Sequence, residues 1–322
     1  GKLVSSSLTY AGGSTGNQSN FTQGSVHLCL EKVKFTGLSH FRQMCRFFGL
    51  NRKQLLYFSL LAVAVIYLRA DQTPGKQLER ICPLPGELTE SSGLVVQDNN
   101  TFWSINDSGG EAVLYQFDST GRLTTKRLVI GASNTDWESL TNQGDTLYIG
   151  DIGNNLNSRT NLCFWALDLN DRGADQLPFA YPDQQHFPPP RNNWNFDAEG
   201  SFYHDSALYW FSKTRVKARP RTKLYRMRTQ PKAKAELIDS FRIDHMITGA
   251  DISTDGKTVV LMGYGKVFRL HPFDPDHPSK LEIESISIPK SQTESIAFLG
   301  SDQCYFTDEQ GSLYRMSMKR FE

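Results

Sequence analysis

The chain has 322 residues and a formal net charge of +1, with 35 Lys and Arg against 34 Asp and Glu. This balance predicts no nucleic-acid partner, because binding to phosphate backbones depends on a clear excess of positive charge. The cysteines are scattered without a Cys/His cluster, which excludes a typical zinc or iron–sulfur site. We expect buried free thiols, although a disulfide through Cys82 stays open. The cysteines are Cys29, Cys45, Cys82, Cys163 and Cys304.

The first part of the chain has the composition of a non-globular segment. Residues 1–43 are rich in Ser, Gly and Asn with little periodicity, which predicts disorder. Met44 stands directly before Cys45 and a basic stretch, as a translation start would, so residues 1–43 need not belong to the mature protein.

An apolar run follows this segment. Residues 55–68 contain no charge and come after Arg52 and Lys53, which is the form of a signal peptide or signal anchor. Leu68 makes a poor cleavage site after Ala70, so an uncleaved anchor over residues 44–70 is favoured over a cleaved signal. The positive flank then places the rest of the chain outside the cytoplasm, in a periplasmic, extracellular or lumenal space. Residues 71–80 read as a polar linker.

One pattern recurs five times between residues 81 and 322. An acidic residue stands beside small and apolar residues, and strand and turn signals follow it. The acids are separated by 48, 61, 52 and 43 residues, and a period of this size indicates one structural unit used repeatedly. The five acids are Glu90, Glu138, Glu199, Asp251 and Glu294.

The repeat predicts an all-β fold, a β-propeller of five four-stranded blades. Each copy shows three clear strands, and outer strands fit at residues 122–129, 235–241 and 281–287. The last copy stops after its third strand, so residues 77–82 would supply its outer strand and close the ring. A six-bladed ring, with residues 171–195 as a degenerate blade, is the alternative. Its prolines suit a loop better than central strands.

In such a ring the inner strands line a central channel, so the five acids should converge at one mouth. Carboxylates this close must be protonated or neutralised by a cation. Calcium, which takes six to eight oxygen ligands, is the natural occupant. The alternative is that the acids cap strands or connect neighbouring blades. The predicted metal ligands are Glu90, Ser92, Glu138, Glu199, Asp251 and Glu294.

Residues 85–322 resemble the calcium-activated nucleotidases, the soluble apyrase family, and more distantly the phytase-like propellers. Glu138, Glu199 and Glu294 fall on the glutamates of the nucleotidase pattern, and Ser92 and Asp251 fall near its two serine positions. The resemblance implies a five-bladed propeller with one calcium ion in the channel, often behind an N-terminal membrane anchor. The long arginine-rich nucleotide loop of that family is not reproduced here.

A basic loop in the third repeat should overhang the same mouth. Its side chains could hold the phosphates of a small substrate, whereas the alternative is a solvated loop or a contact with lipid headgroups. The predicted substrate-binding residues are Lys213, Arg215, Arg219 and Arg221.

Two functions follow from these features. The first is a membrane-anchored, calcium-dependent hydrolase of phosphoanhydrides or phosphoesters, with Asp107 or Asp151 as general base. The second is a non-catalytic propeller that binds a protein, glycan or small ligand around a structural calcium ion. A propeller fold by itself does not choose between them.

Overall fold

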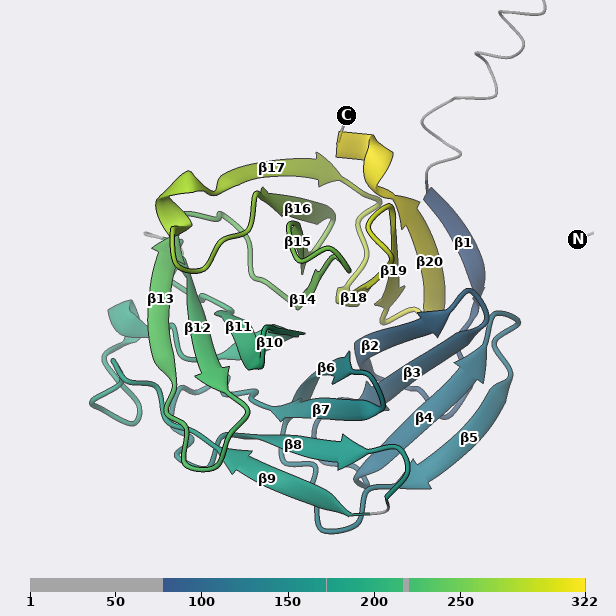
Figure 1. The fold of residues 1–322 in the computed structure, drawn as a ribbon, viewed down its shortest axis with the longest axis horizontal. Coiled ribbons are helices and arrows are strands. Elements are labelled where there is room, and N and C mark those ends of the chain that lie inside the picture. The colour runs from purple at the N-terminus through teal and green to yellow at the C-terminus, as the bar shows by residue number, and fades with distance from the viewer. Residues whose placement is uncertain (1–77, 172, 217–219, 322) are drawn as a thin grey trace, which may run out of the picture. The chain divides into compact units, whose positions relative to one another are not determined.

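The computed structural model describes residues 78–171, 173–216 and 220–321. Within these ranges the chain forms five antiparallel four-stranded sheets arranged as the blades of a propeller (Figure 1). The prediction of five blades is therefore confirmed, and no sixth sheet occurs in the described ranges. From inner to outer strand, blade 1 holds β2 (Ser91–Asp98), β3 (Thr101–Asn106), β4 (Val113–Asp118) and β5 (Leu123–Leu128).

The next three blades repeat this order. Blade 2 holds β6 (Trp137–Gln143), β7 (Thr146–Asp151), β8 (Cys163–Asp168) and β9 (Ala174–Pro178). Blade 3 holds β10 (Ala198–His204), β11 (Ala207–Ser212), β12 (Thr222–Arg228) and β13 (Glu236–Phe241). Blade 4 holds β14 (Gly249–Ile252), β15 (Val259–Gly263), β16 (Lys266–His271) and β17 (Glu282–Ser287).

Blade 5 joins the two ends of the propeller, as the sequence predicts. Its inner three strands come last in the chain: β18 (Thr293–Leu299), β19 (Gln303–Asp308) and β20 (Ser312–Ser317). Its outer strand is β1 (Leu78–Pro83), which pairs antiparallel with β20. This pairing covers the edge that β20 would otherwise present to solvent.

The hydrophobic core lies between the blades. Five buried clusters fill the interfaces between neighbouring sheets, each drawing on two blades. Between blades 2 and 3, for example, Phe164 packs on Phe179 and Trp210, with ring centroids 5.8 and 5.5 Å apart. Aromatic and branched side chains on two-sided sheets suit this packing, which explains their frequency in the sequence.

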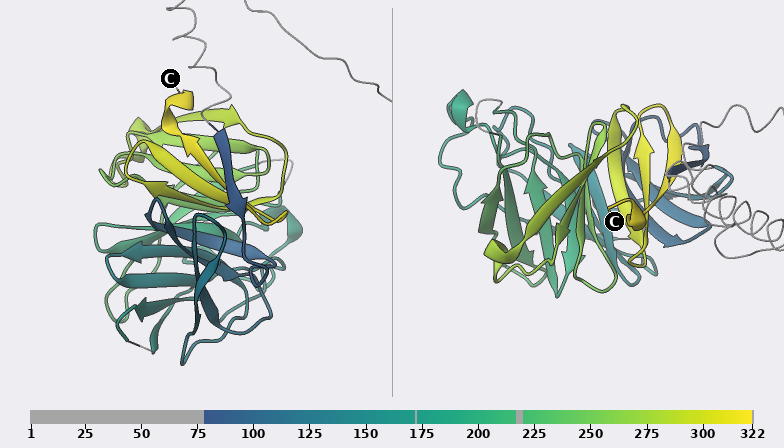
Figure 2. Two further views of the ribbon diagram at one scale, coloured as in Figure 1. Left: turned by 90° about the vertical axis from the view of Figure 1, so that its right-hand side faces the viewer. Right: turned by 90° about the horizontal axis from the view of Figure 1, so that it is seen from above.

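Residues 171–195, the alternative sixth blade, form an outer strand and a long connection instead. Residues 174–178 form β9, the outer strand of blade 2, and a long connection then leads to β10 through a short 3-10 turn, η2 (Arg191–Asn193). Figure 2 shows this turn at the edge of the propeller. Pro178 is the last residue of β9, an edge strand, and the other prolines of residues 171–195 lie in the connection, where no ladder hydrogen bond is needed.

The predicted N-terminal segments lie outside the described residues. This holds for residues 1–43, for the anchor over residues 55–68 and for nearly all of the linker. In the part of the chain that the structure describes, no helix has the length and apolar character needed to cross a bilayer.

Candidate functional site

The inner strands approach one another closely around the axis, and glycines occupy three of the five equivalent positions. A Cβ added to Gly93 would lie 2.6 Å from the backbone nitrogen of Leu140, and one on Gly200 would lie 2.7 Å from the carbonyl carbon of Gly249. On Gly249 it would lie 3.1 Å from Cα of Ser295. These contacts align Gly93, Ser139, Gly200, Gly249 and Ser295 around the channel.

The residue before four of these positions lines a cavity at one end of the channel, whereas the fifth, Thr248 in blade 4, is fully buried outside it. In β6, β10 and β18 this residue is a glutamate, and in each strand the pairing register shifts there, as in a β-bulge. A bulge turns its extra side chain away from the regular ladder, which is a common device next to functional sites. The five aligned residues are Ser92, Glu138, Glu199, Thr248 and Glu294.

Two of the five acids that define the sequence repeat do not occupy equivalent positions. Glu90 lies two residues before Ser92 and is exposed at the rim. Asp251 lies three residues after Thr248, and its carboxylate accepts a hydrogen bond of 2.7 Å from the backbone N–H of Phe298 in blade 5. The expectation of five carboxylates in one ring is wrong in this respect, because the motif of blade 4 is displaced along its strand.

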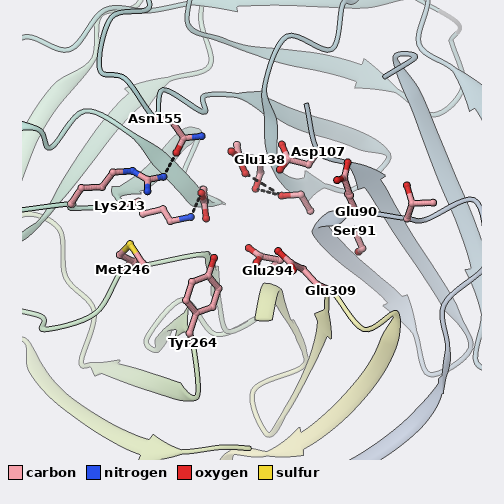
Figure 3. Close-up of a pocket in the computed structure, with 14 residues that line it drawn as sticks. Glu90, Ser91, Asp107, Glu138, Asn155, Lys213, Met246, Tyr264, Glu294 and Glu309 are labelled. Carbon is pink, nitrogen blue, oxygen red and sulfur yellow. Dashed lines mark hydrogen bonds and ion pairs between the residues drawn. The ribbon is translucent and has the colours of Figure 1, made fainter. Parts of the chain in front are cut away.

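Four of the five aligned residues line a cavity of about 430 Å³ at the channel mouth (Figure 3). Glu138, Glu199 and Glu294 reach it from three inner strands, and Lys213, Tyr264 and Asp107 come from the surrounding loops. Of the residues predicted from the sequence, the structure brings eight to this cavity: Glu90, Ser92, Asp107, Glu138, Glu199, Lys213, Arg215 and Glu294.

The other predicted site residues lie elsewhere. Asp151 is buried, and its Oδ1 accepts hydrogen bonds from Arg159 at 2.7 Å and from the backbone N–H of Asp136 at 3.1 Å. These contacts fix a loop, and Asp151 does not line the cavity. Arg221 borders a different cavity. Arg219 belongs to the short stretch outside the described residues.

Lys213 is the cation most deeply inserted among the glutamates. Its side chain is buried and forms an ion pair with Glu199. Burial acts to lower the pKa of Lys213, but the charge and hydrogen bond of Glu199, together with Tyr264 and Asp197, raise it above its usual value. Burial also raises the pKa of Glu199, to about 7, against the opposing effect of Lys213. Lys213 and Glu199 form an ionised pair, because each buried charge is stabilised by the opposite charge beside it.

The two remaining glutamates have no cation of their own. Burial, followed by the charge of Glu199, raises the pKa of Glu138 well above its usual range. The same two causes raise the pKa of Glu294 to about 8, although the Tyr264 hydroxyl hydrogen-bonds this carboxyl. The mouth therefore holds more buried carboxyl groups than its lysine can neutralise, so it favours protons or an added cation.

One oxygen in this group has no partner at all. Glu199 Oε2 is buried and accepts no hydrogen bond from any described residue. An acceptor left in this state is costly, and a hard cation would satisfy it. Carboxylates and hydroxyls with no imidazole or thiolate among them fit calcium better than zinc.

A second group of carboxylates lies to one side of the mouth, where blades 1 and 2 meet. Asp107, Asp136 and Glu138 each offer an oxygen, and these atoms all lie within 4.8 Å of one another. Burial, followed by the charge of Asp107, raises the pKa of Asp136 to about 6. Gly153 leaves room for this approach, because a Cβ there would lie 2.4 Å from Asp136 Oδ2 and 2.7 Å from Glu138 Oε1.

The basic side chains at the cavity are already paired. Arg215 forms an ion pair of 3.0 Å with the fully buried Asp197 and also hydrogen-bonds Asn155. Lys213 is held by Glu199. A phosphate group at this cavity would therefore find carboxylates but no unpaired cation among the described residues. The sequence predicted instead that Lys213 and Arg215 would be free to bind phosphate.

Sequence analysis missed Asp136, Asn155 and Thr248 as members of this region. Asp136 was visible as the second acid of the Asp-Trp-Glu motif, two residues before Glu138. Thr248 is not acidic, and its equivalence to the three glutamates is seen only from the close approach of the neighbouring inner strands. Its hydroxyl donates to the backbone carbonyl of Thr293 at 2.6 Å, much as Ser92 donates to the carbonyl of Glu138 at 3.1 Å.

No protein-family model matches the chain, and no curated protein matches it in sequence. Solved structures with a similar arrangement include a hydrazine synthase from Kuenenia stuttgartiensis, at 10% identity and a TM-score of 0.44, covering 70% of each chain. Virginiamycin B lyase from Staphylococcus aureus is similar at 16% identity and a TM-score of 0.39, covering 73% of this chain and 68% of the lyase. A streptogramin B lyase matches at 12% identity and a TM-score of 0.41, covering 75% and 87%. At these values none of them informs the chemistry of this chain.

Proposed function

We propose that the channel mouth binds a divalent cation, with calcium as the natural ion, and that this cation receives a phosphate-bearing ligand. The observation that carries the proposal is the convergence of Glu138, Glu199 and Glu294 on one cavity with a single buried lysine among them. Glu199 Oε2 supplies a buried oxygen without a partner among the described residues, and burial, followed by the charge of Glu199, raises the pKa of Glu294.

Hydrolysis of phosphoanhydrides or phosphoesters is the activity that this arrangement favours. A bound calcium ion would polarise a phosphoryl oxygen and make bound water more acidic. Asp107 lies at the same cavity, and burial raises its pKa, a change in the direction that favours a general base. Lys213 and Arg215 are already paired with carboxylates, so they would orient the ligand, and the calcium ion would supply most of the attraction for its phosphate.

The serine, glutamate, glutamate, threonine and glutamate around the axis support the resemblance to the calcium-activated nucleotidases. The family assignment, the anchor at residues 55–68 and a location of the propeller outside the cytoplasm remain parts of this proposal. The phytase-like propellers offer the same acid-lined chemistry with a different substrate.

The second candidate is a non-catalytic propeller with a structural calcium ion. It is favoured by one observation, namely that both basic residues at the mouth are engaged with Glu199 and Asp197. In that case the channel mouth would bind a ligand through the cation, and the ligand would not react.

Calcium binding is tested by titration calorimetry and by thermal unfolding with calcium or a chelator. Saturation at about a hundred times the dissociation constant should stabilise the protein by about 2.7 kcal/mol, which raises the melting temperature by roughly 5–10 °C. The double variant Glu138→Gln, Glu199→Gln should lose this response. The double variant Glu236→Gln, Glu284→Gln, on outer strands, is the matched control and should keep it. An unchanged melting temperature on chelation of the wild-type protein would remove the cation from both candidate functions.

Catalysis is tested separately, with phosphate release from nucleoside triphosphates and diphosphates and from phytate. The hydrolase predicts release that requires calcium and falls at least about a hundredfold in Asp107→Asn. Calcium binding without release from any of these compounds would leave the non-catalytic propeller.

A further inference from the structure

A second cavity of about 430 Å³ lies next to the channel mouth. The two cavities share one wall, the extended segment 213–216 that follows β11. Lys213 and Arg215 face the channel mouth, whereas Thr214 and Val216 face the second cavity. The opposite wall is the connection from β9 to β10, which carries η2 and lies beside blade 3 (Figure 1).

This connection is held in place by hydrogen bonds at several points. Trp194 Nε1 donates to the carbonyl of Pro189 at 3.0 Å, and Gln184 Nε2 donates to the carbonyl of Asn157 at 2.8 Å. Asp183 accepts from Lys223 at 2.6 Å and from the Tyr225 hydroxyl at 3.0 Å. A wall fixed in this way loses little conformational freedom when a ligand binds.

Amide side chains on this wall are free to bind a ligand. Gln185, Asn192 and Asn193 line the cavity, are exposed, and make no side-chain hydrogen bond to any described residue. An amide both donates and accepts hydrogen bonds, as a hydroxyl group does. Three such groups around one cavity therefore match a ligand that carries several hydroxyls, and the rings of Pro189 and Pro190 supply carbon surface for its apolar faces.

The charge of this cavity differs from that of the channel mouth. Lys223 is paired with Asp183, but Arg221 has no carboxylate within ion-pair distance among the described residues. Its Nε donates to the Ser240 hydroxyl at 2.9 Å, and its NH2 group donates to the Ser240 carbonyl. The rest of the guanidinium remains available, and a planar fork of donors prefers a carboxylate.

We propose that the second cavity binds a sugar acid, that is, a pyranose with several hydroxyls and one carboxylate. The amides would hold the hydroxyls, and Arg221 would pair with the carboxylate. The volume lies in the range of small-ligand pockets. This site uses no residue of the predicted calcium ring, so it stands apart from the function proposed above.

The probes are D-glucuronate and D-glucose, titrated into the wild-type protein and followed by saturation-transfer NMR and calorimetry. Glucuronate should bind more tightly than glucose. Arg221→Gln should weaken glucuronate about tenfold or more and leave glucose nearly unchanged, because only the carboxylate depends on the charge. Arg122→Gln, the same substitution on blade 1, should change neither affinity.

Asn193→Ala should weaken both sugars several-fold, because it removes a hydrogen bond that the two share. Because Asn193 is exposed, this variant should fold normally, so its sugar affinities test the proposal even if Arg221→Gln does not fold. Glu294→Gln should leave both affinities unchanged, whatever it does to calcium binding. The proposal is overturned if glucuronate does not bind the wild-type protein. It is also overturned if glucuronate binds as tightly to Arg221→Gln and Asn193→Ala as to the wild type.

Discussion

Lys213 sets the balance between the protein's own cation and an added one. It occupies Glu199 Oε1, whereas Glu199 Oε2 has no partner. A calcium ion at the mouth would therefore compete with the ammonium for the same carboxylate. In the absence of calcium, the lysine is the one positive charge that the described residues bury among the three glutamates.

Replacing this lysine should separate stability from cation affinity. Lys213→Met leaves a buried carboxylate unpaired, so without calcium the free energy of unfolding should fall by about 3–5 kcal/mol. Calcium affinity should rise, because the competitor is gone. Chemical denaturation with and without calcium measures the first effect, and calorimetry measures the second.

Lys126→Met is the control for this experiment. Lys126 forms an exposed pair of 3.7 Å with Glu111, so its loss should cost about 1 kcal/mol or less and leave calcium binding unchanged. A fall in calcium affinity in Lys213→Met would show that the lysine supports the cation site rather than competing with it.

Asp251 is a half-buried residue whose carboxyl group connects two blades and does not line the cavity. Burial raises its pKa from 3.8 to about 7, although the N–H of Phe298 opposes this. Between about pH 4 and pH 7 the folded protein thus holds a proton that the unfolded chain has lost. Its contribution to stability falls as pH rises through this window, and the full penalty is present above pH 7.

Asp251→Asn should remove this penalty, because the amide oxygen can still accept from Phe298 without becoming charged. The difference in the free energy of unfolding between the variant and the wild type should increase, in favour of the variant, by on the order of 2–4 kcal/mol from pH 5 to pH 8.5. Urea unfolding at the two pH values measures it. Asp255→Asn in the same blade is the control. Hydrogen bonds from Ser253 and Lys257 lower the pKa of Asp255, so that variant should show no gain. Equal pH profiles for wild type and Asp251→Asn would contradict the assignment.

The cysteines among the described residues behave as small apolar side chains. Cys82, Cys163 and Cys304 are free and buried, as expected from their scattered positions. Burial raises the pKa of Cys82 and of Cys163 to about 11, so neither forms a thiolate readily at neutral pH.

At the scale of the strand, the close approach of inner strands depends on residues without a Cβ. Gly93 combines a positive φ of 84° with a neighbouring strand that leaves no room for a side chain. Gly93→Ala should therefore lower the free energy of unfolding by about 2–4 kcal/mol, through backbone strain and overpacking together.

Gly109→Ala is the matched control, because Gly109 has a similar φ of 81° but nothing within 4 Å of an added Cβ. It should cost only about 1–2 kcal/mol, from the backbone alone. Denaturant unfolding of the two variants gives the difference. Equal losses would show that the packing of β2 on β6 adds nothing beyond the backbone strain.

At the scale of the whole molecule, β1 is the closing element of the ring. A chain that begins at Leu84 lacks this strand and leaves the edge of β20 open. It should melt at a lower temperature and self-associate as its concentration rises, because an unpaired edge is a template for another strand. Thermal unfolding and light scattering measure both effects. A chain that begins at Leu78 keeps the strand and is the control. If the two chains melt together, closure by β1 does not stabilise the propeller.

The sequence by itself determined the architecture and most of the candidate site. Strand alternation and turn signals repeat at near-regular intervals, so blade number, four of the five outer strands and closure by the N-terminal strand were predictable. The outer strand of blade 2, β9, was missed because its proline-rich surroundings favour a loop. Glu138, Glu199 and Glu294 were found because each stands at the start of an inner strand. The role of the site as a cation centre stays a prediction.

Only the tertiary structure decided which residues share the mouth. Strand register across five blades depends on the packing of neighbouring sheets. In blade 4 the position equivalent to the three glutamates is Thr248, three residues before Asp251, and neither residue lines the cavity. The pairing of Lys213 and Arg215 with Glu199 and Asp197 was equally invisible, because a charge in the sequence does not reveal its neighbour in space. The second cavity arises for the same reason, since it needs two connections of blade 3 to lie side by side.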